Sequence, residues 1–356
     1  LKKAMRMLVN EMDEDDTIAI VVYAGAAGTV LQPTPGSDKA AIMAALDQLH
    51  AGGSTAGGEG IRQAYALAKL SYRDNAVNRV ILATDGDFNV GINDPERLED
   101  FVSEQRDSGI DLTVLGFGRG NYNDLLMQKL AQAGNGNAAY IDTLREARKV
   151  LVDEIGGTLF TIAKDVKIQV EFNPAEVLEY RLIGYETRAL NREDFANDKV
   201  DAGDIGSGHT VTAIYEIVPA GSDARWTEPL RYQSLPPTTE TTAGDEIAHV
   251  RIRYKRPDDE QSELIETAIG KDSAVADVAA LPVDVRFAAA VAAFGQKLRG
   301  GTFLGDFDYR DIATLAAGAK GPDTFGYRAE FTQLLDLAET ADALPELQRP
   351  TIGYTQ

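Results

Sequence analysis

Two short segments carry side chains that could bind a metal ion. The first, AGGSTAGGEG, places the hydroxyl groups of Ser54 and Thr55 among five glycines. The second, ATDGDFNVG, places the carboxylates of Asp85 and Asp87 directly after an apolar run. Hard divalent cations such as Mg2+ prefer oxygen ligands. The residues alone leave a simpler interpretation open, in which Thr55 caps a helix and Asp85 forms a turn.

The sequence argues against other chemistry at these loops. The glycine-rich segment lacks the G-x-x-x-x-G-K-[ST] pattern of a phosphate-binding loop and does not follow a strand. A dehalogenase-type phosphatase needs a D-x-D nucleophile at the end of an early strand, whereas Asp111 and Thr113 stand at the beginning of one. His50, His209 and His249 lie near no serine or acid pattern, so no catalytic triad can be assigned.

The first part of the chain alternates between strand and helix patterns. Short unbroken apolar runs, typical of strands covered on both faces, occur at residues 17–23, 79–84, 110–117 and 138–141. Helical patterns occur at residues 1–12, 39–50, 61–70 and 124–132, after Asp94-Pro95, and after Thr143 in a long helix that reaches about residue 163. This alternation predicts an α/β domain with a doubly wound, mostly parallel sheet and helices on both faces.

The predicted topology determines where a ligand would bind. In an open parallel sheet, the ligand site lies outside the carboxyl ends of the strands. Asp85 directly follows the strand at residues 79–84, so its carboxylate is expected at that edge of the sheet.

Several motifs carry a resemblance to a known family. The segments GGST (52–55) and VILATDG (80–86) resemble a von Willebrand factor type A domain, which has a Rossmann-like fold, and LGFG (115–118) and LAQAGNGNAAYID (130–142) fit that family's last strands. The segments TDGDFNVG, GFGRGNYND, IAKDVKIQVEFNP, YRLIGYE and FGYRAEF are similar to the YfbK-like group of bacterial lipoproteins, which joins a type A domain to a distinctive C-terminal extension.

The resemblance implies a metal-ion-dependent adhesion site. In the type A family this site combines a D-x-S-x-S loop, a threonine of a second loop and an aspartate of a third. By position, Thr55 would be the threonine and Asp85 the aspartate, with Ser54 and Asp87 as weaker ligands. The implied ion is Mg2+ or Mn2+, and a carboxylate of a protein partner would complete its coordination.

One part of the family pattern is missing. No D-x-S-x-S occurs in residues 1–356, and Leu1 falls where the family's first helix is already under way. We therefore expect the chain to be a fragment that lacks the first strand of its sheet. We also expect it to bind the metal more weakly than a chain with the complete motif, and we expect a lipid anchor upstream.

Beyond residue 160 the pattern changes. Val166, Ile168, Val170 and Phe172 alternate with polar residues, as in an antiparallel strand with one wet face. Further strands are predicted at residues 178–186, 210–218 and 247–255, loops at 191–208 and 231–246, and helices at 283–300, 309–317 and 325–343. The predicted domains are a type A domain (1–163), an antiparallel β-sandwich-like region (164–262) and a small C-terminal helical region (275–346).

Composition narrows the class of function. A net charge of −21 argues against a nucleic-acid partner. The absence of cysteine excludes disulfides and thiolate metal sites. No apolar run is long enough to span a bilayer. We predict a non-catalytic protein-binding module of the adhesion or assembly type, at the periplasmic or outer surface of the cell envelope. The alternatives are a scaffold with an unused cation site and a metal-dependent hydrolase, for which no nucleophile or base is found.

Overall fold

The computed structural model divides the chain into two compact units. Unit 1 comprises Leu1–Lys167, Ala196–Thr210 and Ile252–Leu264, and unit 2 comprises Ile168–Phe195, Val211–Arg251 and Ile265–Gln356. The structure describes residues 1–23, 28–50, 57–85, 95–118, 123–154, 156–157, 160–185, 189–200, 202–228, 244–257, 259 and 261–344.

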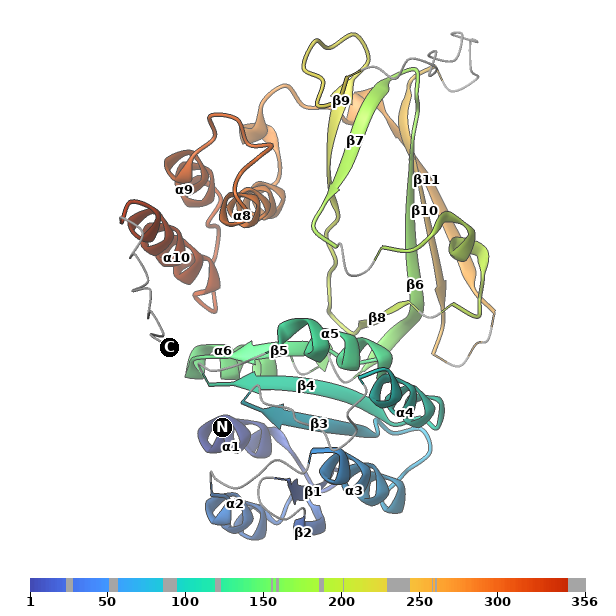
Figure 1. Cartoon of the computed structure of the whole chain (residues 1–356), viewed down its shortest axis with the longest axis vertical. Coiled ribbons are helices and arrows are strands. Elements are labelled where there is room, and N and C mark those ends of the chain that lie inside the picture. The colour runs from blue at the N-terminus through green and yellow to red at the C-terminus, as the bar shows by residue number, and fades with distance from the viewer. Residues whose placement is uncertain are drawn as a thin grey trace, which may run out of the picture. The chain divides into compact units, whose positions relative to one another are not determined.

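A three-stranded parallel sheet forms the centre of unit 1 (Figure 1). Its strands are β3 (Arg79–Thr84), β4 (Asp111–Phe117) and β5 (Ala138–Ile141), in that order. The register pairs Arg79 with Asp111 at one end of β3 and Thr84 with Gly116 at the other. All three strands coincide closely with the predicted apolar runs. Only β4 is buried on both faces as predicted, since Ile81 on β3 is 36% exposed and Tyr140 on β5 is 39% exposed.

Helices cover both faces of this sheet. On one face, α3 (Gly57–Leu70), α4 (Pro95–Asp107) and α5 (Asp124–Ala133) pack their apolar residues against Val80, Leu82, Leu112 and Val114. On the other face, α1 (Lys2–Glu11) and α6 (Leu144–Arg148) pack against Leu115 and Ile141. The predicted doubly wound α/β fold is therefore confirmed.

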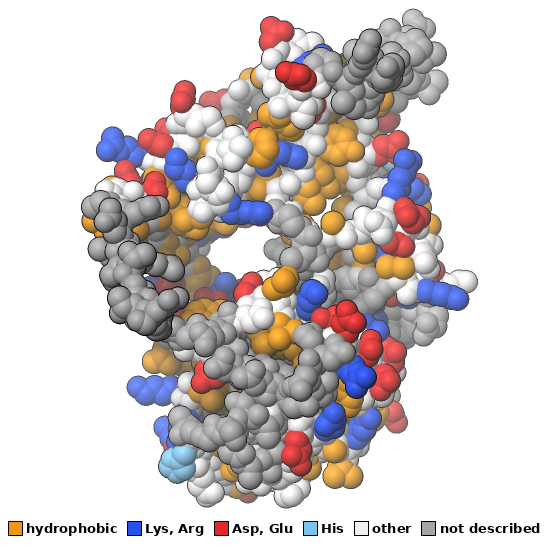
Figure 2. Space-filling model, viewed as in Figure 1, with side chains coloured by type: hydrophobic (Ala, Val, Ile, Leu, Met, Phe, Trp, Pro, Cys, Tyr) orange, Lys and Arg blue, Asp and Glu red, His pale blue; other side chains and the backbone are white. Residues whose placement is uncertain are grey.

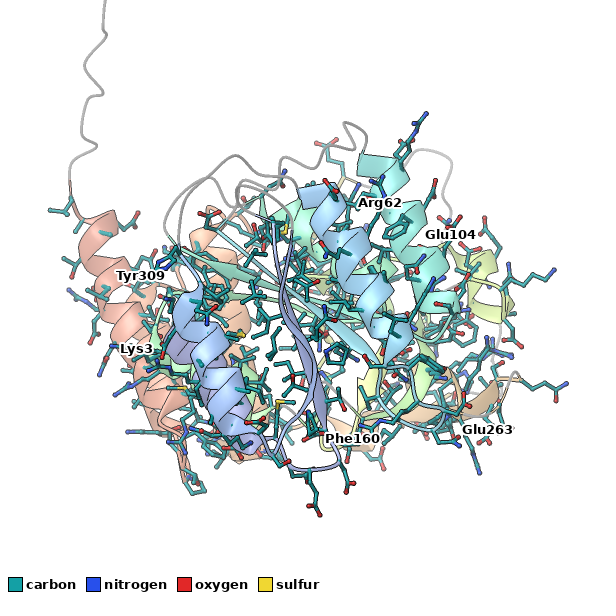
Figure 3. All side chains as sticks on the ribbon, turned by 90° about the horizontal axis from the view of Figure 1, so that it is seen from below. Lys3, Arg62, Glu104, Phe160, Glu263 and Tyr309 are labelled. Carbon is teal, nitrogen blue, oxygen red and sulfur yellow. The ribbon has the colours of Figure 1, made fainter. Side chains whose placement is uncertain are left out.

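An antiparallel ribbon accompanies the sheet. It consists of β1 (Thr17–Val22) and β2 (Gly28–Pro35), and in the described residues it forms a sheet of its own. The ribbon runs between α2 (Lys39–Gln48) and α3 (Figure 3). The sequence did not predict β2, because its two prolines and its polar residues are not typical of a strand. Strand β2 forms through its antiparallel pairing with β1.

The chain after α6 differs from the prediction. The expected long helix to about residue 163 is wrong: α6 passes into a π-helical turn, η1 (Lys149–Asp153), and strand β6 (Thr161–Phe172) has begun by Thr161. The first residues of β6 pair with β8 (Gly203–Gly206), Thr161 opposite Gly206 and Ala163 opposite Ile205. The loop predicted at 191–208 accordingly contains β8 and a 3-10 helix, η3 (Arg192–Ala196).

The remaining strands form two antiparallel sheets. One has the order β11-β10-β6-β8, with β10 at Glu246–Lys255 and β11 at Glu263–Gly270. The other pairs β7 (Val177–Ile183) with β9 (Ile214–Pro219). The predicted antiparallel region is confirmed, although β11 was not predicted. Two short 3-10 helices follow, η4 (Lys271–Ser273) and η5 (Val278–Ala280).

Three helices complete unit 2. They are α8 (Val283–Leu298), α9 (Tyr309–Gly318) and α10 (Tyr327–Asp342), as predicted. Their shared core includes Ala290, Ile312 and Leu335. A capping box between Asp308 and Asp311 starts α9. Within the described ranges, no helix combines the length and apolar character needed to cross a bilayer.

Candidate functional site

The carboxyl ends of β3 and β4 meet at one edge of the parallel sheet, which we call the rim. Asp85 follows β3 directly, and Gly118 follows β4 directly. A Cβ atom on Gly118 would lie 3.7 Å from the Cβ atom of Asp85, so the two residues are close neighbours. Gly118 has a φ of +97°, a conformation that favours glycine. The rim therefore places a carboxylate beside a residue without a side chain.

The Asp85 side chain is not bound by any described residue. The residue is exposed, and its carboxylate forms no hydrogen bond or ion pair with the part of the chain that the structure describes. The residue before it, Thr84, is 5% exposed. Thus the chain leaves the apolar core between two consecutive residues, and the first side chain outside the core is an acid.

The donor chemistry of the described rim fits a hard cation, since no described residue binds the Asp85 carboxylate and Gly118 has no side chain beside it. It does not make a complete site. Among the described residues, no group of three or more His, Cys, Asp or Glu side chains could hold a metal ion. The other predicted ligands, Thr55, Ser54 and Asp87, lie outside the described residues, so their roles stay predictions.

Two tyrosines at the rim were not found by sequence reasoning. The hydroxyl of Tyr23, at the end of β1, donates to the carbonyl oxygen of Ala83 over 2.6 Å. The hydroxyl of Tyr140, on β5, donates to the carbonyl oxygen of Gly118. The only sequence signal was the position of each tyrosine near the end of an apolar run, which does not identify the backbone group that it binds.

A polar cavity of about 250 Å³ lies elsewhere in unit 1. It is lined by charged residues and one asparagine: Arg106, Asp107, Asn135, Lys164, Asp165, Asp198, Lys199, Asp204 and Lys255. Its acids already have partners, since Asp165 is 2.7 Å from the Lys255 ammonium and Asp198 accepts a 2.6 Å hydrogen bond from Ser262. This cavity adjoins the start of β4, not the rim, and is a separate feature.

The two signs of charge are mixed at the surface. On the face that Figure 2 shows, acidic and basic side chains are intermingled.

Comparison with known families assigns both halves of the chain. Residues 1–153 match the von Willebrand factor type A domain, and residues 157–341 match the family described as "Uncharacterized protein YfbK, C-terminal". The chain belongs to the YfbK family. A YfbK protein of Escherichia coli (strain K12) is 47% identical over 339 residues, which are 95% of this chain and 58% of that protein. The chain therefore spans little more than half the length of this YfbK relative.

Two more distant similarities cover different shares of the chain. "Uncharacterized protein sll0103" of Synechocystis sp. is 29% identical over 147 residues, 41% of this chain and 34% of that protein. The solved structure of a "von Willebrand factor type A" protein from Catenulispora acidiphila is 16% identical to this chain. The match covers 92% of this chain and 76% of that one, with a TM-score of 0.45.

Proposed function

We propose that the type A domain of this YfbK-family chain is a non-catalytic protein-binding module that works through a divalent cation at the rim. Asp85 would hold Mg2+ or Mn2+, with Thr55 and Ser54 as the predicted hydroxyl ligands and Asp87 as a weaker one. The observation that supports this proposal is the exposed Asp85 carboxylate, which no described residue binds, at the carboxyl end of a strand of the parallel sheet.

The class of partner follows from charge. A chain with a net charge of −21 repels an acidic partner unless a cation lies between them. A hard cation held by few protein oxygens keeps open coordination positions, and a carboxylate suits them. We therefore propose a protein partner that offers an aspartate, a glutamate or a C-terminal carboxylate. A location at the cell envelope, with a lipid anchor, stays a prediction.

Calorimetric titration with Mn2+ tests the cation site. We expect binding to the unsubstituted chain that EDTA abolishes and that Asp85→Asn reduces by about tenfold or more. Glu104→Gln is the matched control, because Glu104 is an exposed acid on α4 and its replacement also removes one negative charge (Figure 3). Equal Mn2+ binding by Asp85→Asn and by the unsubstituted chain would contradict the site.

The same experiment separates the alternatives. A chain that binds no Mn2+ at millimolar concentration would favour the scaffold with an unused site. Turnover of p-nitrophenyl phosphate that disappears in Asp85→Asn, but not in Glu104→Gln, would favour the hydrolase.

A further inference from the structure

Tyr23 links two strands that do not pair with each other. In the described residues, β1 pairs with β2 and β3 pairs with β4, and no backbone ladder joins β1 to β3. The Tyr23 hydroxyl spans this separation and donates to the carbonyl oxygen of Ala83 over 2.6 Å. Ala83 is two residues before Asp85. The side chain thus provides a hydrogen bond to the end of β3 on the side where β3 has no described strand neighbour.

The other side of Tyr23 rests on helix α3. A Cβ atom on Gly60, in the first turn of α3, would lie 2.4 Å from the Cβ atom of Tyr23 and 3.2 Å from its Cγ. Helix and tyrosine are therefore in such close contact that only glycine fits at position 60 without a shift. α3 begins two residues after Thr55, and β3 ends directly before Asp85. Tyr23 thus contacts the two elements that adjoin these predicted ligands in the chain.

The environment of the phenol keeps it a hydrogen-bond donor. Burial raises the pKa of Tyr23 above its ordinary value of 10.0; the hydrogen bond with Thr84 lowers this pKa and the charge of Asp85 raises it. At neutral pH the hydroxyl is therefore protonated. The Tyr23 hydroxyl therefore lies beside Thr84 and Asp85, at the carboxyl end of β3.

We propose that Tyr23 is a positioning residue for the cation site: it fixes the end of β3, and with it Asp85, relative to the first turn of α3. This inference rests on the proposed function. Ligand-bearing elements must be held to within about 0.5 Å for a defined coordination geometry. In the described structure, the Tyr23 hydroxyl bond and the contact with Gly60 supply that restraint together.

The test compares Tyr23→Phe with Tyr65→Phe. Tyr23→Phe keeps the ring on Gly60 and removes only the hydroxyl that binds Ala83. Tyr65→Phe is the matched control, because it makes the same change in the same core, at a hydroxyl without a hydrogen bond to any described residue. The readouts are hydrogen–deuterium exchange of segments 57–65 and 79–85 and the Mn2+ dissociation constant.

For Tyr23→Phe we expect faster exchange in both segments and a Mn2+ affinity lower by about tenfold or more, the usual effect of removing a group that orients a metal ligand. Gly60→Ala, which pushes the ring away and keeps the hydroxyl, should have the same two effects. Tyr65→Phe should accelerate exchange in neither segment and leave the Mn2+ affinity unchanged.

Two results would overturn the inference. One is unchanged exchange at residues 79–85 in Tyr23→Phe, which would show that the hydroxyl restrains nothing. The other is faster exchange with unchanged Mn2+ affinity, which would make Tyr23 purely structural. If the unsubstituted chain binds no Mn2+, the proposed function fails and Tyr23 has no site to position.

Discussion

Arg79 and Asp111 form an ion pair at the first residues of β3 and β4, with Nη2 of the arginine 3.0 Å from Oδ2 of the aspartate. The Arg79 side chain is 5% exposed and also donates to the Thr113 hydroxyl over 2.8 Å. Burial raises the pKa of Asp111 and lowers the pKa of Arg79, so it disfavours the charged form of both side chains. The pair lies at the end of β3 opposite the rim.

Breaking this pair should destabilise the protein more than removing it. We expect Asp111→Ala to lower the free energy of unfolding by about 3–5 kcal/mol, because it leaves a buried guanidinium without its counter-charge. The double variant Arg79→Met/Asp111→Leu should be much closer to the unsubstituted chain. Urea denaturation of the single and double variants measures the difference. A double variant as unstable as the sum of its single variants would show that the two side chains do not interact.

Asp111 should also make stability depend on pH. Because its folded pKa is raised, the folded chain binds a proton more tightly than the unfolded chain, whose carboxyl has its ordinary value of 3.8. The contribution of this group to stability therefore falls as pH rises from below 3.8 through the raised folded pKa. We expect the stability of the unsubstituted chain relative to Asp111→Asn to decrease over that interval. A relative stability that increases there would contradict the direction of the shift.

Tyr65→Phe should stabilise unit 1. Tyr65 is 1% exposed, and its ring packs edge-on against Phe101 with centroids 5.6 Å apart. Its buried hydroxyl has no hydrogen-bond partner in the described structure. Removing an unsatisfied polar group should raise the free energy of unfolding by about 1 kcal/mol. A loss of stability of similar size would mean that the hydroxyl is hydrogen-bonded in solution.

Gly136→Ala should be strongly destabilising. A Cβ atom at Gly136 would lie 1.8 Å from the carbonyl oxygen of Leu112, so β4 or the α5–β5 connection would have to shift. We expect Gly136→Ala to lower the free energy of unfolding by about 1–3 kcal/mol or more, the usual cost of overpacking a core. Gly295→Ala is the control, because the residue is inside α8 and its added Cβ would meet no described atom within 4 Å other than its chain neighbours and the backbone of its own helix. Gly295→Ala should raise the free energy of unfolding by roughly 0.5–1 kcal/mol, because alanine is more stable than glycine inside a helix. Thermal unfolding of both variants measures the two effects.

Arg181 should hold the helical region to strand β7 within unit 2. Its guanidinium contacts Glu216 and Gln296, and its Cζ atom is 3.9 Å from the centroid of the Phe303 ring and 5.6 Å from that of Trp226. We expect Arg181→Ala and Arg181→Lys both to accelerate hydrogen exchange around Gln296 and Phe303, because lysine lacks the planar group that stacks and binds two acceptors.

The control for Arg181 is Arg310→Ala. Arg310 pairs with Glu339 at the surface, with 84% of its side chain exposed, and such pairs contribute at most about 1 kcal/mol. Exchange around Gln296 and Phe303 should stay as in the unsubstituted chain. Equal exchange in Arg181→Ala and Arg310→Ala would show that Arg181 does not fasten the helices.

Local patterns determined much of the fold. The apolar run before Thr84 ends where the chain meets Asp85 and Gly86, and β3 ends at the same point. Helices α8 to α10 follow apolar stripes with clear beginnings, such as the capping box of Asp308. In these elements the residues that form the structure lie within one or two turns of each other, so the sequence alone contains the information.

Longer-range contacts determined the rest. The apolar spacing before residue 163 was compatible with a helix, but pairing of Thr161 with Gly206 makes that segment a strand. Strand β2 likewise exists because β1 provides backbone partners for it. A backbone hydrogen bond between strands depends on which segments meet in space, and composition does not encode that choice locally.

The candidate site divides in the same way. From the sequence, the position of Asp85 after an apolar run, in a segment that alternates strands with helices, was enough to predict a carboxylate at the end of a parallel strand. Only the tertiary structure decided that Gly118 stands beside Asp85 and that the Tyr23 hydroxyl reaches Ala83. Those contacts join residues 33 and 60 positions apart in the chain, and such distances are set by how the strands and helices pack.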